Sequence, residues 1–101
     1  MSSGAITIDG EHDTDRGWLY TLSVSGDDGV VRDHELTMSW VDHEHLVGGA
    51  IPPNLVANAS ARIALEHFGL HELPARFDVA NLRRLVDDFD ERVRTMINAP
   101  L

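Results

Sequence analysis

The sequence predicts an α+β fold, in which a three-stranded antiparallel meander precedes two or three helices packed on one face of the sheet. Apolar residues alternate with polar ones in three runs, over residues 5–9, 18–24 and 31–41, with the period of a half-buried strand. Over residues 53–98 the apolar residues recur at helical spacing, and glycines and prolines separate the segments. With 101 residues, of which 43% are apolar and 25% charged, the chain fits a single domain over 1–101.

Two runs of alternating residues predict a β-hairpin of residues 18–25 and 30–41. The apolar members of each run share one face: Trp18, Tyr20, Leu22 and Val24 in the first run, and Leu36, Met38 and Trp40 in the second. Between them, Gly26–Gly29 supplies residues that tolerate the positive φ of a tight turn. We expect residues 6–9 to add a third strand through a polar loop at 10–16.

The second half of the chain begins with a helix at residues 54–68. Pro53 suits its first turn, where a missing N–H costs nothing, and Gly69 is expected to end it in a left-handed conformation. Its alanines permit close approach to the sheet. We expect the main sheet-to-helix contact to join one set of residues (Trp18, Tyr20, Leu36, Met38 and Trp40) to another (Ile63, Phe68, Leu82 and Phe89).

A further helical stripe extends over residues 79–98, with Asp78 as its N-cap. The sequence leaves open whether this stripe is one helix or two, because Asp87-Asp88 could cap a second, shorter helix. Opposite charges at i,i+4 predict ion pairs on its solvent side: Arg83–Asp87, Arg84–Asp88, Asp88–Arg92 and Asp90–Arg94.

The segment Asp42-His43-Glu44-His45 is the strongest candidate for a chemical site. Two histidines at i,i+2 share a face on a strand and could bind one metal ion, with His34, His12 or His67 as a third ligand. On a helix the same two side chains diverge by about 200°. The local signals favour a helical turn with Asp42 as its N-cap, so we predict no metal ligand and keep His34, His43 and His45 as the alternative.

Other candidate sites have weaker patterns. The acidic loop at residues 9–15 lacks the sixth-position glycine and twelfth-position glutamate of a calcium-binding loop. His67 and His71 have the spacing of the two histidines in a zinc-protease helix, but Gly69 lies between them and is expected to end the helix. No cysteine is present, and no nucleophile elbow or phosphate-binding glycine loop occurs. We therefore expect no catalytic residues and no cofactor.

The charge balance bears on possible partners. The net charge is −9 and all eight basic residues are arginine, so the field repels phosphate backbones and anionic membrane surfaces. No apolar run approaches the roughly 20 residues that cross a bilayer, and the first residues lack the pattern of a signal peptide. We expect a cytoplasmic protein that binds neither nucleic acid nor membrane.

Two stretches carry a resemblance to known proteins. "GGAIPPNLVANASARIAL" resembles the helix entry of organic hydroperoxide reductases of the OsmC type, whose activity depends on a cysteine pair that this chain lacks. Together with "LPARFDVANLRRL" and the hairpin, the "LVGG-x-I-P-P" entry is similar to short uncharacterised bacterial α+β proteins. This resemblance covers about residues 18–90 and implies no function.

We expect a small non-enzymatic domain that acts through protein–protein contact, as a homodimer or with another protein. The apolar surface of two tryptophans, Tyr20 and an alanine-rich helix, together with the open edge of a short sheet, supports this hypothesis. The alternative is a metal-dependent or histidine-based enzyme centred on His43 and His45.

Overall fold

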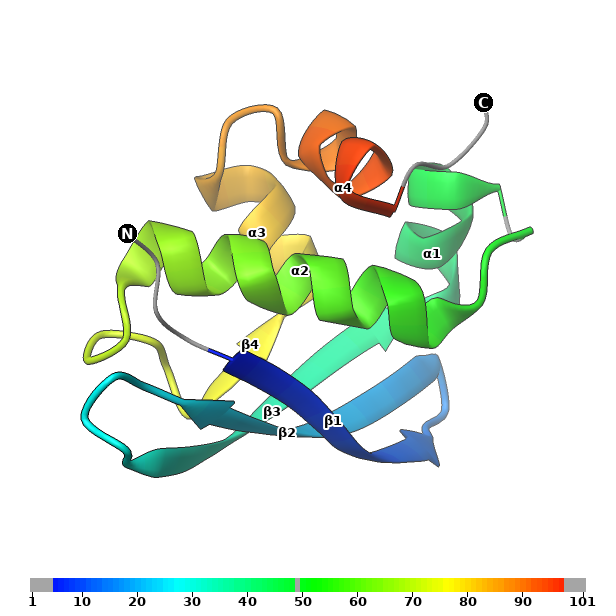
Figure 1. The fold of residues 1–101 in the computed structure, drawn as a ribbon. Helices are drawn as coiled ribbons and strands as arrows, with labels where there is room; N and C mark the ends of the chain where they lie inside the picture. The colour runs from blue at the N-terminus through cyan, green and yellow to red at the C-terminus, as the bar shows by residue number, and fades with distance from the viewer. Residues whose placement is uncertain (1–4, 49, 98–101) are drawn as a thin grey trace.

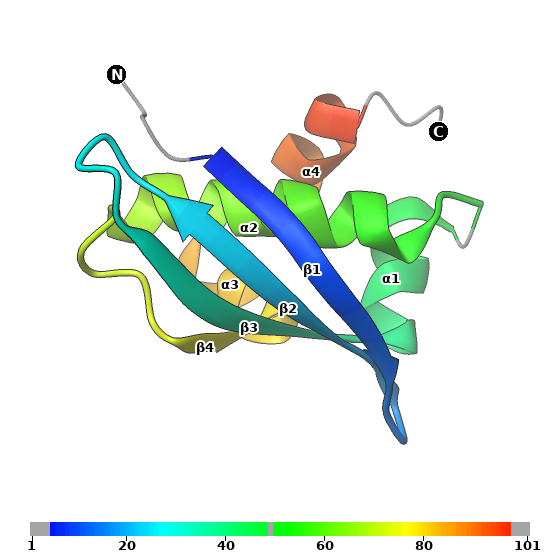
Figure 2. The same ribbon diagram turned by 60° about the horizontal axis from the view of Figure 1, so that its bottom comes forward.

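The fold is α+β, as predicted, with every helix on the same side of one sheet (Figures 1 and 2). The computed structural model describes residues 5–48 and 50–97. The strands are β1 (Ala5–Asp13), β2 (Gly17–Ser25), β3 (Val31–Ser39) and β4 (Arg76–Asp78). The helices are α1 (Trp40–Val47), α2 (Pro53–Phe68), α3 (Val79–Leu85) and α4 (Phe89–Ile97).

The predicted hairpin of residues 18–25 and 30–41 is confirmed as the antiparallel pair β2–β3, although β3 ends at Ser39. In the turn between the strands, the N–H of Gly29 donates to the carbonyl of Gly26 over 3.0 Å. Gly29 has a φ of 77°, which a residue with a side chain rarely adopts. The turn therefore depends on the glycine that the sequence indicated.

The predicted loop at residues 10–16 is wrong, because β1 continues to Asp13 and only three residues remain for the turn. A β-bulge between Ile8 and Gly10 shifts the register, so that Gly10 lies opposite Thr21. A Cβ atom at Gly10 would lie 2.8 Å from Oγ1 of Thr21, so glycine permits this close approach. Charged residues are common after a bulge on an edge strand, and here they resembled a loop in the sequence.

The sequence analysis missed β4, which pairs in parallel with β3 to give the strand order β1-β2-β3-β4. Three residues are too short to show an alternating pattern. The pair is held by the N–H of Glu35, which donates to the carbonyl of Ala75, and by Oγ1 of Thr37, which donates to Asp78 over 2.7 Å. Asp78 also caps α3, as predicted, by accepting from the N–H of Ala80.

The start of α1 corrects another prediction. Its N-cap is Ser39, whose Oγ accepts from the N–H of Asp42 over 3.0 Å, so Asp42 lies in the first turn instead of capping it. Pro53 begins α2, as expected. Gly69 ends α2 with a positive φ of 82°, but its ψ of 161° lies outside the left-handed helical region that we predicted.

The stripe over residues 79–98 forms two helices in its described part, α3 and α4. The break falls at Asp88, whose φ of 59° no helix accommodates. Within residues 5–48 and 50–97, none of the four predicted i,i+4 ion pairs forms. The break turns these arginines towards other partners: Arg83 pairs with Asp42 and Asp90, and Arg92 pairs with Glu66.

The core lies between the sheet and the helices. Most of the predicted contact residues are buried there: Tyr20, Leu36, Met38, Ile63, Leu82 and Phe89. Trp18 and Phe68 are partly buried against this core. Trp40 is the exception at 54% exposed, because the chain turns into α1 at this residue and its side chain no longer follows the strand alternation.

Among the described residues, no helix combines the length and apolar character needed to cross a membrane.

Candidate functional site

Helix α1 divides the candidate segment between two faces. Its buried side carries Asp42, His43, Leu46 and Val47, and its exposed side carries Trp40, Val41, Glu44 and His45. The two histidines therefore lie on different faces, as the helical interpretation requires.

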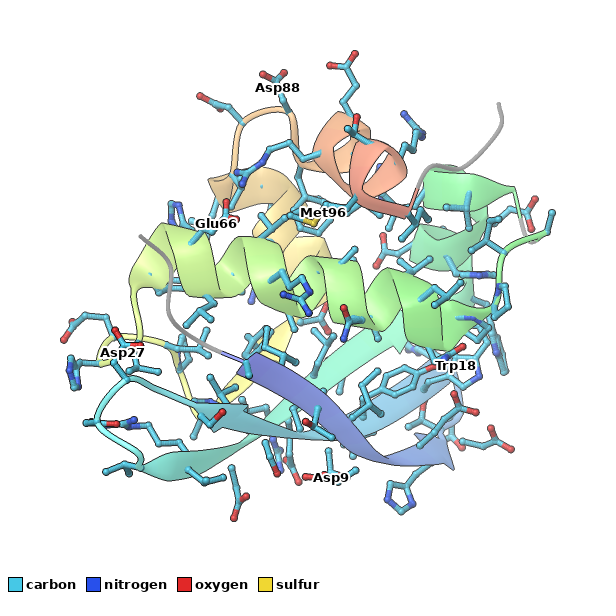
Figure 3. All side chains as sticks on the ribbon, in the orientation of Figure 1. Asp9, Trp18, Asp27, Glu66, Asp88 and Met96 are labelled. Atoms are coloured by element: carbon cyan, nitrogen blue, oxygen red, sulfur yellow. The ribbon has the colours of Figure 1, made fainter. Side chains whose placement is uncertain are left out.

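His43 belongs to the core. It is 7% exposed, and its Nε2–H donates to the carbonyl of Ile51 over 2.7 Å, since a carbonyl can only accept. Its ring lies edge-on to the indole of Trp18, with 5.3 Å between the ring centroids. Figure 3 labels Trp18 at the end of the sheet beneath the start of α2. His43 thus fixes the segment between α1 and α2 to the sheet.

His45 lies on the exposed side, in the last turn of α1. The backbone around it is bound by Arg94 of α4, whose Nη2 donates to the carbonyl of His45 over 2.9 Å and whose Nε donates to that of Leu46 over 2.7 Å. A guanidinium therefore satisfies carbonyls that the end of a helix leaves free.

His34, the proposed third ligand, lies on β3 and is 6% exposed. Its Nδ1–H donates to the carbonyl of Pro74 over 2.7 Å, and its ring packs edge-on against Phe77. Its Nε2 has no hydrogen-bond partner in the described part of the chain. Across residues 5–48 and 50–97, no group of three His, Cys, Asp or Glu side chains could hold a metal ion.

Asp42 participates in a charged cluster between α1, α3 and α4. Nη1 of Arg83 donates to its Oδ1 over 2.9 Å, and the rest of the guanidinium binds both carboxylate oxygens of Asp90. The hydrogen bonds to Asp90, and then those to Asp42, raise the pKa of Arg83. An open hollow of about 700 Å³ lies beside this cluster. Arg83 is bound to two carboxylates, so the three side chains together carry a net charge of −1 and the guanidinium is already occupied.

The face of the sheet opposite the helices is uncovered and polar. Figure 3 labels Asp9 on this face, below the ribbon of β1 and away from α2. A shallow hollow of about 530 Å³ is lined by Asp9, Asp33, Glu35 and Arg76, among other residues. Asp9 accepts a hydrogen bond from Ser23, and Arg76 pairs with Glu35 over 2.6 Å. The acidic stretch compared with a calcium loop is therefore mostly strand, and its first carboxylate is bound to β2.

The exposed pair Trp40 and Val41 was missed as a surface feature. A signal for it existed in the sequence, because Ser39-Trp40-Val41-Asp42 matches the S/T-x-x-D/E pattern of a helix start. Ser39 and Asp42 do exchange hydrogen bonds across this turn. Assigning Ser39 as the N-cap would have moved Trp40 from the strand into the helix.

Comparison with known proteins assigns this chain to no family. No protein-family model, no curated protein and no solved structure matches the chain. The resemblance to short bacterial α+β proteins therefore stays a prediction.

Proposed function

We propose that this domain works through protein–protein contact, and that the exposed side of α1 is its binding surface. The observation that carries the proposal is the exposure of two adjacent apolar side chains, Trp40 at 54% and Val41 at 64%. Tryptophan is enriched among the residues that dominate binding energy, because one rigid side chain buries a large area at a low entropic cost.

The helix that carries this surface is held rigidly. Its start is capped by Ser39, its buried side is bound through Asp42 to Arg83, and its last carbonyls accept from Arg94. A surface that is ordered before binding loses little conformational freedom when the partner docks. These contacts therefore support a preformed binding site.

The same face indicates the chemistry of the partner. Glu44 and His45 lie one helical turn beyond Trp40 and Val41, on the same exposed side. Together with the net charge of −9, Glu44 favours a partner segment with an apolar side chain beside arginine or lysine. A cationic side chain can also stack on the exposed indole.

The alternative, an enzyme centred on His43 and His45, has less support. The two imidazoles lie on opposite faces of α1, and His43 already donates to the carbonyl of Ile51. His34 is bound to a different loop. A shared catalytic or metal-binding role would require these side chains to leave their present contacts.

Affinity capture with three forms of the protein tests the proposal. We expect a basic partner to bind the wild type, to be lost with Trp40→Ala, and to be retained by Leu85→Ala, a matched variant of an apolar side chain that is 56% exposed on α3. Binding should weaken as salt is added. The proposal is wrong if nothing binds, or if Trp40→Ala captures the same partner as the wild type while both variants keep the native circular dichroism spectrum.

A further inference from the structure

Strand β1 forms an open edge of the sheet. It is the outer strand in the order β1-β2-β3-β4 and nine residues long. In both ribbon views no other labelled strand lies beyond it (Figures 1 and 2). An open edge of this length presents unpaired backbone N–H and C=O groups to any strand that can approach it.

The two halves of this edge differ in how well they are protected. After Ile8 the strand contains a bulge, and three ionisable residues follow in Glu11-His12-Asp13. The imidazole of His12 reaches back to within 3.3 Å of where a Cβ atom of Gly10 would lie. Bulges and charges of this kind are the features by which native proteins prevent strand pairing at an edge.

The first half of β1 has none of these features. Residues 5–8 are Ala-Ile-Thr-Ile, which carry no charge and include three β-branched side chains. They pair with β2 in regular register, Ala5 opposite Ser25 through to Ile8 opposite Leu22. Residues 5–8 therefore lack the bulge and the charges that protect the second half of the strand.

We propose that a second copy of this chain pairs along the first half of β1, antiparallel and about a two-fold axis at Thr7, so that residues 6–8 of the two copies lie opposite one another. This register places Ile6 opposite Ile8 of the partner subunit on the helix side, where Ile6 is buried and Ile8 packs against the core. It places Thr7 opposite Thr7 of the partner subunit on the uncovered face. β-Branched and Thr–Thr pairs directly opposite one another stabilise antiparallel strands. The segment is therefore complementary to itself, which a two-fold interface requires.

The charge of the chain sets the strength of this pairing. Each copy carries −9, so two copies repel each other and the short interface gives a weak, reversible dimer. Screening by salt reduces this repulsion, so added salt should strengthen the dimer. The opposite salt dependence expected for the basic partner of α1 separates the two surfaces, and either proposal can fail without the other.

Single cysteine variants test the register, since the chain has no cysteine of its own. Two Thr7→Cys copies would meet across the axis within disulfide reach. His12→Cys is the matched control, because it lies on the same edge and on the same uncovered face, opposite Leu19. Five positions from the axis, its copies would be about 30 Å apart.

On mild oxidation we expect Thr7→Cys to form a disulfide-linked dimer much faster than His12→Cys. Light scattering should show wild type and Trp40→Ala dimerising alike as concentration and salt rise, and Thr7→Lys remaining monomeric. The proposal is overturned if the wild type stays monomeric at millimolar concentration, if the two cysteine variants cross-link equally fast, or if Trp40→Ala abolishes the dimer.

Discussion

Arg83 and Asp42 are in direct contact although 41 positions separate them in the sequence, with 2.9 Å between Nη1 and Oδ1. The same guanidinium binds Asp90 through Nε and Nη2. Asp42 also contacts Ser39, the N-cap of α1. One arginine of α3 therefore links the first turn of α1 to the first turn of α4. Helix α1 is also the helix that carries the exposed Trp40.

Replacing Arg83 should destabilise the protein clearly. Arg83→Met keeps most of the apolar stem but leaves the largely buried carboxylate of Asp42 without its cation. We expect the free energy of unfolding to fall by about 2 kcal/mol, below the cost of breaking a fully buried pair because the Arg83 side chain is 26% exposed. Urea denaturation followed by circular dichroism measures this change.

The neighbouring arginine supplies the control. Arg84→Met removes a side chain that forms an exposed hydrogen bond to Asn81, so its cost should stay within about 0.5 kcal/mol. In a double-mutant cycle, Asp42→Asn should cost less in the Arg83→Met background than in the wild type. Equal costs in both backgrounds would show that the pair contributes nothing.

His43 and His45 should respond differently to substitution. His43→Ala removes a buried ring, leaves the carbonyl of Ile51 without its donor and opens space beside Trp18, so it should cost about 2 kcal/mol. His45→Ala changes an exposed side chain and should cost less than about 0.5 kcal/mol. Thermal unfolding with and without a chelator measures both effects. A site that bound metal through both histidines would instead lose its chelator response in either variant.

The elements that were predicted correctly are those with repeated patterns. Trp18 to Val24 alternate over a full strand, and Pro53 to Gly69 delimit a helix, so many residues contribute to each prediction. The cap at Asp78 was also recognisable from its local chemistry. The helical interpretation of His43 and His45 was correct because its signals lay within one turn, although the residue that caps the helix is Ser39 and not Asp42.

The features that were missed depend on contacts distant in sequence. β4 is a strand only because residues 76–78 lie beside β3, 41 positions away. Arg83 has an available carboxylate at i+4, but the break at Asp88 brings Asp42 and Asp90 closer to it. A short strand and a choice between ion-pair partners are decided by tertiary packing, which local periodicity does not contain.

Asp88 offers a test of the break between α3 and α4. Its φ of 59° is strained for a residue with a side chain and free of strain for glycine. Asp88→Gly should therefore raise the free energy of unfolding by about 0.5–1 kcal/mol, although the unfolded chain gains freedom. Asp87→Gly is the control, because the φ of Asp87 is not positive and glycine relieves no strain there. The greater freedom of the unfolded chain should then lower the free energy of unfolding. Chemical denaturation compares the two, and a loss in both variants would contradict the inferred strain.

Tyr20 should make the stability depend on alkaline pH. It is the only tyrosine, its side chain is fully buried, and its hydroxyl has no hydrogen-bond partner in the described part of the chain. Burial, followed by the nearby carboxylate of Glu11, raises its pKa far above the usual 10.0. The folded protein therefore keeps the phenol proton at pH values where the unfolded chain releases it.

The direction of the effect follows from this difference in proton binding. Below pH 10 both states hold the proton and stability is unaffected, whereas above it the unfolded state loses the proton first. The free energy of unfolding should then fall by up to about 1.4 kcal/mol per pH unit. The phenolate absorbance should rise together with unfolding, and Tyr20→Phe should unfold at a higher pH than the wild type. Phenolate that forms while the circular dichroism spectrum is still native would contradict the buried, protonated state of Tyr20.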